Sequence, residues 1–555
     1  MASLQGTVAA KVRFAGFVSC MGAAFLAACG EERKTVVPPV DAGNDGGTIR
    51  VDAGEDSGPE DAGSDASLDA GDAAPPLLGL GEPCTTAAEC ESDVCLPADL
   101  GGTCTPACAH NPDCEARDEV CLVLPVDADV DGTPDDFRLG CGAPREPGYT
   151  VGNLCEAHDD CRNRRCDSEV CSAPCVDASD CAFGMACVDV LVGFVAGTYP
   201  GCGFSTRLTD PQVDEFDMGD VTIARDGGGS TIVGLAIPPD AVSFAVNALQ
   251  TDEVEPLAIS FTSVYDPDVD LLLSAGDLGS GDDQPLRCFP WLHVDTMLMP
   301  NSTVDRLEIQ TGLYTWRNVS VPQVEGGAWP EIDVHLTAYI KRAGAVLDAG
   351  TLDINLWMVD IGVSAAEAPA NARIQNALDE LDVILAQAGM VLGDVTYYDA
   401  PAGDAGRLGV IDTYEDFDSE LSDLFRLSDG LTGFAVNVFY VRAIAGSILG
   451  IAGGVPGPVK LHGTLHSGVA VEGEPGVLNA AQLAAVTGHE VGHYLGLFHP
   501  TENPGRDPLY DDDPIADTVY GDNNNLMHWA ADLGTPNTEL SAGQGFVLLR
   551  NPAVR

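Results

Sequence analysis

Short apolar runs, separated by Gly, Pro and Asp, dominate the chain between residues 210 and 350. Each run is long enough for one strand, and the region has no strong helical periodicity. Strands at this spacing are typical of an antiparallel β-sandwich. The predicted strands cover residues 242–249, 257–264, 269–273, 307–321 and 332–340.

From residue 351 to 555 strand-like runs alternate with helical ones. Apolar runs at 352–359, 391–398 and 435–441 predict strands. Two helices are predicted between these strands, the first ending at Gly389. The first helix is marked by Ile374, Leu378, Leu381, Ile384, Leu385 and Ala388, and the second by Phe417, Leu421, Leu424 and Phe425. This alternation predicts an α/β (α+β) domain at the C-terminal end of the chain.

A further helix, capped by Asn479, carries the candidate chemistry. His489 and His493 are four residues apart, so their imidazoles project from one helix face and can reach one metal ion. Gly496 can leave the helix in a left-handed conformation, which returns His499 to the same ion. Three neutral imidazoles with an open fourth position are the ligand set of a catalytic zinc.

The string His489-Glu490-Val491-Gly492-His493-Tyr494-Leu495-Gly496-Leu497-Phe498-His499 resembles the metzincin zinc endopeptidases. The resemblance implies one zinc ion held by the three histidines, with Glu490 as general base. It also implies that Met527 forms the methionine turn beneath the zinc. Trp529 stands where several members carry a tyrosine, and an indole cannot act as a phenol does. Together with the later string Leu540-Ser541-Ala542-Gly543-Gln544, the motif is most similar to the pappalysin-like bacterial enzymes.

Sixteen of the 19 cysteines fall into two successive blocks with matching gaps, which indicates an internal duplication over residues 81–145 and 146–205. Eight cysteines per block in an exported chain predict four disulfides each, with 105 pairings open per block. The blocks are Cys84, Cys90, Cys95, Cys104, Cys108, Cys114, Cys121 and Cys141, then Cys155, Cys161, Cys166, Cys171, Cys175, Cys181, Cys187 and Cys202. Their role is either a docking module or a rigid stalk.

Residues 1–28 have the organisation of an export signal, with a basic start and an apolar run too short to remain as a membrane span. Leu26-Ala27-Ala28-Cys29 resembles the bacterial lipobox, which implies acylation of Cys29 and an outer-membrane lipoprotein that faces the periplasm or the cell surface. Residues 29–80 are acidic, with a recurring Asp-Ala-Gly, and are expected to form a disordered linker.

The formal charge of the chain is -60, from 86 acidic and 26 basic residues. Nucleic acids and anionic lipid surfaces require a basic footprint, so neither is an expected partner. The expected partners are protein or peptide substrates, together with a membrane held through the lipid anchor.

Two further sites are hypotheses with alternatives left open. Cys288, within Pro285-Leu-Arg-Cys-Phe-Pro290, is similar to the cysteine switch of metzincin pro-segments, or is a free thiol packed in the sandwich core. An acidic stretch resembles a calcium loop, or is simply solvated, because Arg138 stands where an EF-hand supplies glutamate. Its candidate ligands for Ca²⁺ are Asp127, Asp129, Asp131 and Asp135.

The sequence therefore predicts a multidomain protein with a disulfide-rich region, an antiparallel β-sandwich and a metzincin-like catalytic domain. The predicted activity is that of a lipid-anchored zinc metalloendopeptidase. The alternative is a surface adhesion or binding lipoprotein whose metzincin-like domain is inactive or latent. His462 and His466 are spaced like a second pair of ligands, but their Gly-rich, strand-like context favours surface histidines.

Overall fold

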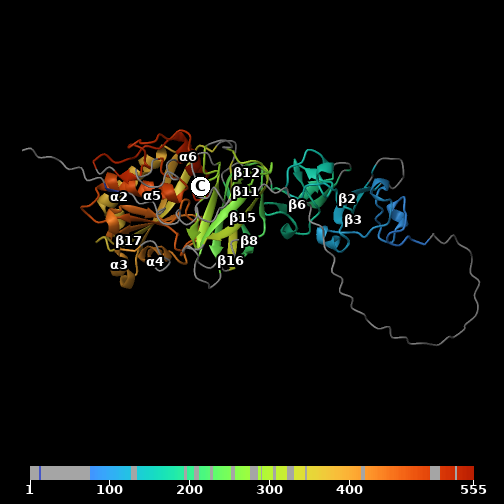
Figure 1. Cartoon of the computed structure of the whole chain (residues 1–555), viewed down its shortest axis with the longest axis horizontal. Helices are drawn as coiled ribbons and strands as arrows, with labels where there is room; N and C mark the ends of the chain where they lie inside the picture. Colours follow the sequence, from blue (N-terminus) through green and yellow to red (C-terminus); the bar gives the residue numbers. More distant parts are fainter. Residues whose placement is uncertain are drawn as a thin grey trace, which may run out of the picture.

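The computed structural model describes most of residues 76–555, and the repeats, the sandwich and the α/β unit follow one another along its length (Figure 1). Most of the signal peptide, Cys29 and most of the linker lie outside the described residues, as do Asp127, Asp129, Asp131 and Asp135. The description covers residues 12–13 and 76–555 except 127–133, 135, 193–194, 196, 206–211, 225–228, 252–256, 275–284, 289, 304–307, 322–330, 344–346, 414–418, 501–512 and 532–533.

The cysteine-rich region contains eight disulfides, and their pairing divides each predicted block into two smaller units. In every group of four cysteines, the first bonds the third and the second bonds the fourth. The pairs are Cys84–Cys95, Cys90–Cys104, Cys108–Cys121, Cys114–Cys141, Cys155–Cys166, Cys161–Cys171, Cys175–Cys187 and Cys181–Cys202. The region is thus four successive two-disulfide units, which is a finer repeat than the duplication that the gaps predict.

Each unit has a short 3₁₀ turn in which an acidic residue directly before the second cysteine caps the turn. Asp180, for example, accepts hydrogen bonds from the Val176 and Asp177 N–H groups. The turns are Ala87–Glu89, Asn111–Asp113, His158–Asp160 and Ala178–Asp180. Small two-stranded sheets complete three of the units: β2 (Val120–Val126) with β3 (Asp136–Gly142), β4 (Cys166–Asp167) with β5 (Val170–Cys171), and β6 (Ala186–Leu191) with β7 (Thr198–Gly203).

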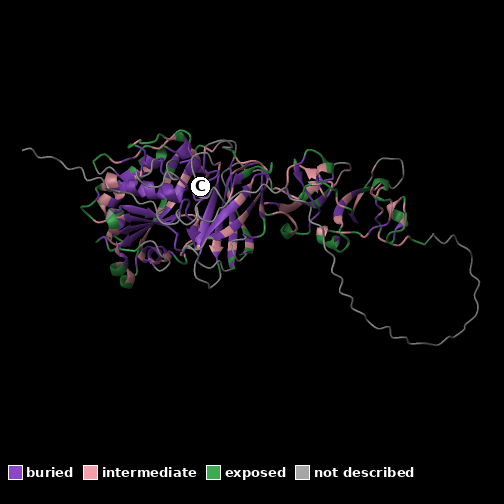
Figure 2. Cartoon of the chain, viewed as in Figure 1, coloured by how far each residue is buried: buried purple, intermediate pink, exposed green. Residues whose placement is uncertain are grey.

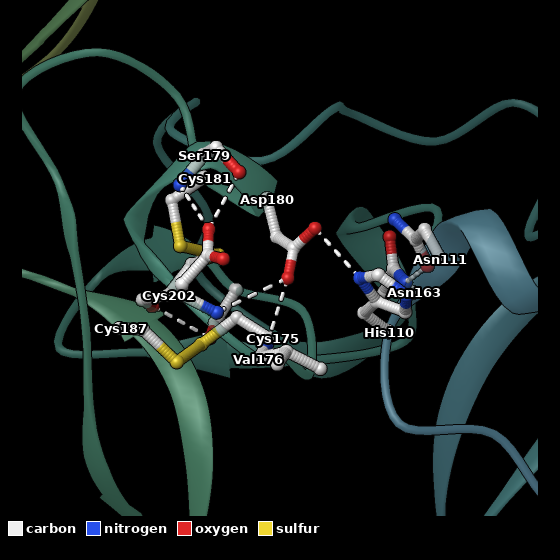
Figure 3. Close-up of a disulfide and its surroundings, with 12 residues drawn as sticks. His110, Asn111, Asn163, Cys175, Val176, Ser179, Asp180, Cys181, Cys187 and Cys202 are labelled. Carbon is white, nitrogen blue, oxygen red and sulfur yellow. Dashed lines mark hydrogen bonds and ion pairs between the residues drawn. A yellow bond between two sulfur atoms is a disulfide. The ribbon is translucent and has the colours of Figure 1, made fainter.

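The two halves of this region dock through polar side chains. His110 lies 2.6 Å from Asp180 (Figure 3), and the Asn163 amide donates to Asn111 at 2.7 Å. The hydrogen bond to Asp180 raises the pKa of His110 above its ordinary value. The contact between the halves therefore includes an ion pair when His110 is protonated.

Two antiparallel sheets form the predicted sandwich. The first has the order β14-β10-β16-β8, and the second has the order β12-β11-β15-β9, with β13 also on β11. The bounds are β8 (Gln212–Ile223), β9 (Val233–Ile237), β10 (Ala241–Gln250), β11 (Ala258–Tyr265), β12 (Leu271–Leu273), β13 (Trp291–Leu292), β14 (Val294–Met299), β15 (Gly312–Val321) and β16 (Ile332–Arg342).

Strands β10 and β14 of the first sheet are buried on both faces over most of their length. Successive side chains of a strand point to opposite faces, so Phe244 and Val246 of β10 enter the sandwich core while Ala245 joins the core of the α/β unit. Leu298 of β14 and Tyr339 of β16 join the α/β core in the same way. Figure 2 shows the buried strands of both units. Side chains of the sandwich therefore contribute to the hydrophobic core of the α/β unit.

The α/β unit contains a five-stranded sheet of order β18-β17-β20-β23-β22, parallel except for its last strand, β22. Its strands are β17 (Gly350–Val359), β18 (Met390–Asp399), β20 (Val436–Val441), β22 (Gly450–Ala452) and β23 (Val469–Glu472). Side chains of β17 alternate between two clusters, with Leu356 toward α2 and α5 and Trp357 toward α3 and α4. The helices are α2 (Ala372–Ala386), α3 (Ala402–Leu408), α4 (Glu420–Arg426), α5 (Ala480–Tyr494) and α6 (Ala542–Arg550).

Smaller elements complete the unit. Strand β19 (Val410–Ile411) pairs with β21 (Ala443–Ile444), and β1 (Val12–Arg13) pairs with β24 (Ala530–Ala531). The C-terminus of the chain lies between the sandwich and the α/β unit (Figure 1), where Val554 forms a bridge with Leu352 of β17. Among the described residues, no helix has the length and apolar character needed to cross a membrane.

Candidate metal centre

Helix α5 runs through the interior of the α/β unit and carries the histidine motif. Asn479 caps its first turn reciprocally with Gln482, because each side chain accepts a hydrogen bond from the other's backbone N–H. Every residue from Leu483 to Tyr494 is buried. Gly496, just after the helix, has a φ of +113°, which is the left-handed conformation expected from the sequence.

The chain reversal at Gly496 brings the three predicted ligands together. The Nε2 atoms of His489 and His493 lie 3.1 Å apart, and they lie 3.2 and 3.0 Å from Nε2 of His499. The three residues are 1%, 4% and 4% exposed. Within the described part of the chain, this is the one group of potential metal ligands that is not made of disulfide cysteines.

The protonation of these rings favours a cation between them. Nδ1 of His489 lies 2.7 Å from the Leu526 carbonyl oxygen, and Nδ1 of His493 lies 2.7 Å from that of Leu497. A carbonyl can only accept, so both Nδ1 atoms carry the proton and the Nε2 atoms of the neutral rings present lone pairs. Facing lone pairs at this distance repel one another unless a cation binds them.

The separations also fit the size of a metal ion. Ligands about 2.0–2.1 Å from a tetrahedral zinc lie about 3.3 Å from one another, close to the spacing found here. Burial lowers the pKa of His489 well below its ordinary value, and the neighbouring rings of His493 and His499 act in the same direction. The neutral imidazole, which is the metal-binding form, is thus the favoured state of His489.

Glu490 follows the first ligand on α5 and lies against the edge strand β22. The Ala452 N–H donates a hydrogen bond to its carboxylate, and the group is 2% exposed. Burial raises the pKa of Glu490 well above its ordinary value, and this hydrogen bond opposes the shift. A methyl group on Gly450 would lie 2.5 Å from Glu490 Oε1. Glycine at position 450 is therefore what allows the carboxylate to lie against this strand.

Met527 lies beneath the histidines and is fully buried. A methyl group on Gly492, between the first two ligands, would lie 2.6 Å from its sulfur atom. The Met527 N–H donates to the Asn525 side chain, which exchanges hydrogen bonds of 3.0 Å with Gln544 of α6. The sequence identified Met527, whereas the roles of Asn525 and Gln544 could not be read from it, because they depend on a tertiary contact.

The two residues after Met527 differ in burial. His528 is 6% exposed and lies near enough to His489 to contribute to the lowered pKa of that ring. Trp529 is half-buried. His528 is a further polar group near the centre that sequence reasoning did not single out, and only its position beside Met527 could have indicated it.

The other candidate residues lie elsewhere. Cys288 is buried in the sandwich core with Leu286 and Met297, and it is the one free cysteine among the described residues. His466 is buried, with Nε2 2.8 Å from the Leu292 carbonyl oxygen, so its predicted surface position is wrong. His462 is half-buried and receives a hydrogen bond from Asn437. Both histidines bind backbone or amide groups in place of solvent.

Comparison with known proteins adds little to what the geometry of the site shows. No protein-family model matches the chain, and no curated protein matches its sequence. Among solved structures, metalloproteinase-II from Bacteroides fragilis is 16% identical over 37% of this chain and 53% of its own, with a TM-score of 0.25. The acetyl xylan esterase Est2A of Butyrivibrio proteoclasticus is 9% identical over 34% of this chain and 50% of its own, with a TM-score of 0.13. The chain thus spans about half the length of each, and TM-scores this low do not establish a shared fold.

Proposed function

We propose that this protein is a metzincin-like zinc metalloendopeptidase of the bacterial cell envelope, exported and held by a lipid on Cys29. The observation that carries the proposal is the convergence of three histidine Nε2 atoms within 3.2 Å of one another, next to a buried glutamate. The resemblance of the His489–His499 string to metzincins supports the choice of zinc. The eight disulfides support an oxidising, extracytoplasmic location.

In this proposal each residue has a defined task. A bound zinc would polarise a scissile carbonyl and lower the pKa of a coordinated water. His489 and His493 present their Nε2 lone pairs because the Leu526 and Leu497 carbonyls hold the Nδ1 protons. Glu490 would accept the proton of the attacking water on its carboxylate and deliver it to the leaving amine.

The position of β22 supports a peptide as the substrate. It is the last strand in the order of its sheet, and its Ala452 N–H reaches the Glu490 carboxylate. This strand is buried at all three positions, so an extended peptide would add to its edge through main-chain hydrogen bonds only after the edge is uncovered. A peptide bound there would run past the proposed general base.

One observation favours a second function, in which the domain is latent and the protein acts by binding. The three histidines and Glu490 are only 1–4% exposed. A site that cleaves proteins must admit an extended chain. A small chelator that removes zinc from a protein unable to cleave casein would support this latent state.

Cleavage of casein by the full chain, purified in detergent and loaded with zinc, tests the proposed activity. Glu490→Gln should abolish cleavage and keep the zinc, whereas His493→Ala should lose both. Cleavage that survives Glu490→Gln would refute the assigned base. A wild-type protein that is folded but binds no zinc would refute the metal centre.

A further inference from the structure

The loop after α5 controls two of the three proposed ligands. His499 belongs to the loop itself, and the Leu497 carbonyl oxygen of the same loop receives the Nδ1 proton of His493. A shift of this loop would therefore move one imidazole and release the hydrogen bond that orients another. Residues that hold the loop in place should set the affinity for the metal.

The β-sandwich contacts this loop, as α6 does. A methyl group on Gly496 would lie 2.9 Å from Leu298 Cδ2 of β14 and 3.6 Å from Val547 Cγ1 of α6. The guanidinium carbon of Arg287 lies 4.6 Å from the centre of the Phe498 ring, next to His499. Both side chains are buried, at 4% and 6% exposure.

The backbone of Arg287 is itself fixed in the sandwich. The Asn301 side chain accepts a hydrogen bond from the Arg287 N–H at 3.1 Å and donates one to its carbonyl oxygen at 2.6 Å. Asn301 is fully buried. The neighbouring Cys288 packs into the sandwich core, so Arg287 and not the thiol reaches the metal-binding loop.

Two other contacts extend this support around the centre. The Leu292 carbonyl oxygen lies 2.8 Å from Nε2 of His466, whose loop follows β22. Thr303 donates its N–H to the Pro514 carbonyl oxygen and accepts the Ala516 N–H on its hydroxyl at 2.6 Å. One segment of the sandwich, residues 285–303, thus contacts three loops of the α/β unit.

From these contacts we infer that Arg287 is a positioning residue of the metal centre, acting through Phe498 on His499, and that the sandwich is a permanent part of this centre. The inference rests on the proposed metal site and adds that the affinity for the metal depends on another domain. If the sandwich were instead a pro-segment that is removed on activation, its removal would also remove Arg287 from the metal centre.

The test measures the zinc dissociation constant of the full chain, purified in detergent, by competition with a chromophoric chelator. Arg287→Ala should raise this constant about 10–100-fold, the usual effect of removing a residue that orients metal ligands. Arg317→Ala is the matched control, because Arg317 donates to the Ser230 carbonyl within the sandwich. It should leave the constant within about twofold of the wild type, since it orients no ligand.

Phe498→Leu removes the aromatic face and keeps an apolar side chain, so it should weaken zinc binding in the same direction. The double variant Arg287→Ala, Phe498→Leu should bind zinc no more weakly than the single variant with the lower affinity, because both changes remove the same interaction. Additive effects, or an Arg287→Ala constant equal to that of the wild type, would overturn the inference. If Arg287→Ala does not fold, Arg287→Met, which keeps a long apolar stem and removes the cation, replaces it in the same cycle.

The two proposals fail in different ways. A wild-type chain that binds zinc, loses it in Arg287→Ala and leaves casein intact would refute the peptidase and support the positioning role. A chain that cleaves casein and keeps its zinc affinity in Arg287→Ala would support the peptidase and refute the role of Arg287.

Discussion

Two glycines of α5 provide a matched test of the methionine turn. Gly488 and Gly492 each precede a histidine ligand, and both lie within the helix. A methyl group on Gly488 would lie 3.3 Å from Leu381 Cδ1 and 3.5 Å from Leu526 Cδ1, which are the mobile ends of leucine side chains. A methyl group on Gly492 would lie 2.6 Å from the sulfur of the fully buried Met527. The same substitution should therefore have opposite effects at the two positions.

The magnitudes follow from two opposing contributions. Alanine is favoured over glycine within a helix by about 1 kcal/mol, and this gain applies to both variants. Overpacking a close-packed core costs about 1–3 kcal/mol, and this cost applies mainly to Gly492→Ala. Gly488→Ala should thus be neutral or stabilise by up to about 1 kcal/mol. Gly492→Ala should be about 1–3 kcal/mol less stable than Gly488→Ala.

The assay is urea unfolding of both variants in a chelator, followed by zinc titration of the folded proteins. Met527 lies beneath His489 and His493, so its displacement in Gly492→Ala should also weaken zinc binding, whereas Gly488→Ala should bind as the wild type does. Equal stabilities and equal zinc affinities for the two variants would refute the contact between Gly492 and Met527.

Three further predictions concern other parts of the molecule. Gly450→Ala should lower casein cleavage about 100-fold by displacing Glu490, with zinc affinity unchanged; a parallel loss of zinc would contradict this. Burial lowers the pKa of Lys341 to about 7, so the unfolded state binds more protons above that pH and stability should rise from pH 7 to 9. In Lys341→Met, the free energy of unfolding measured in urea should no longer rise over this pH range. An unchanged rise would mean that another group causes it. The pKa of His110 is raised, so docking of the two cysteine-rich halves should be strongest below pH 6.5. The docking should weaken as the pH rises through this pKa, and hydrogen exchange at the contact measures the change. Asp180→Asn should remove that dependence, and a variant that retains it would exclude the pair.

The sequence predicts the convergence of His489, His493 and His499 because this geometry is mostly local. His489, His493 and Gly496 are related by helical spacing and by one chain reversal, and both are properties of a short segment. One of the two contacts that orient the rings is not local. The Leu497 carbonyl lies four residues from His493, but the Leu526 carbonyl that accepts the His489 Nδ1 proton lies 37 residues from His489 and depends on how the segment after His499 folds back under α5.

The strands show a similar division. The predicted range 332–340 lies within β16, and 242–249 lies within β10, because apolar runs mark both. Strand β8 was not predicted, since its acidic and partly exposed sequence carries no apolar run. Among the cysteines, the gaps indicate a duplication, but only the disulfides reveal that each repeat consists of two units, because many pairings satisfy the same spacing.

The contact between the sandwich and the metal centre explains why the middle of the chain could not be interpreted fully from its sequence. Strand β14 (Val294–Met299) is buried at every position, a pattern that indicates cover on both faces but not what provides it. The structure places Met297 in the sandwich core and Leu298 against Gly496. Strand β14 thus packs in the sandwich core with one face and against the α/β unit with the other. Since the loop beyond Gly496 carries His499, Leu298 of β14 packs beside the histidine cluster while Met297 packs in the sandwich.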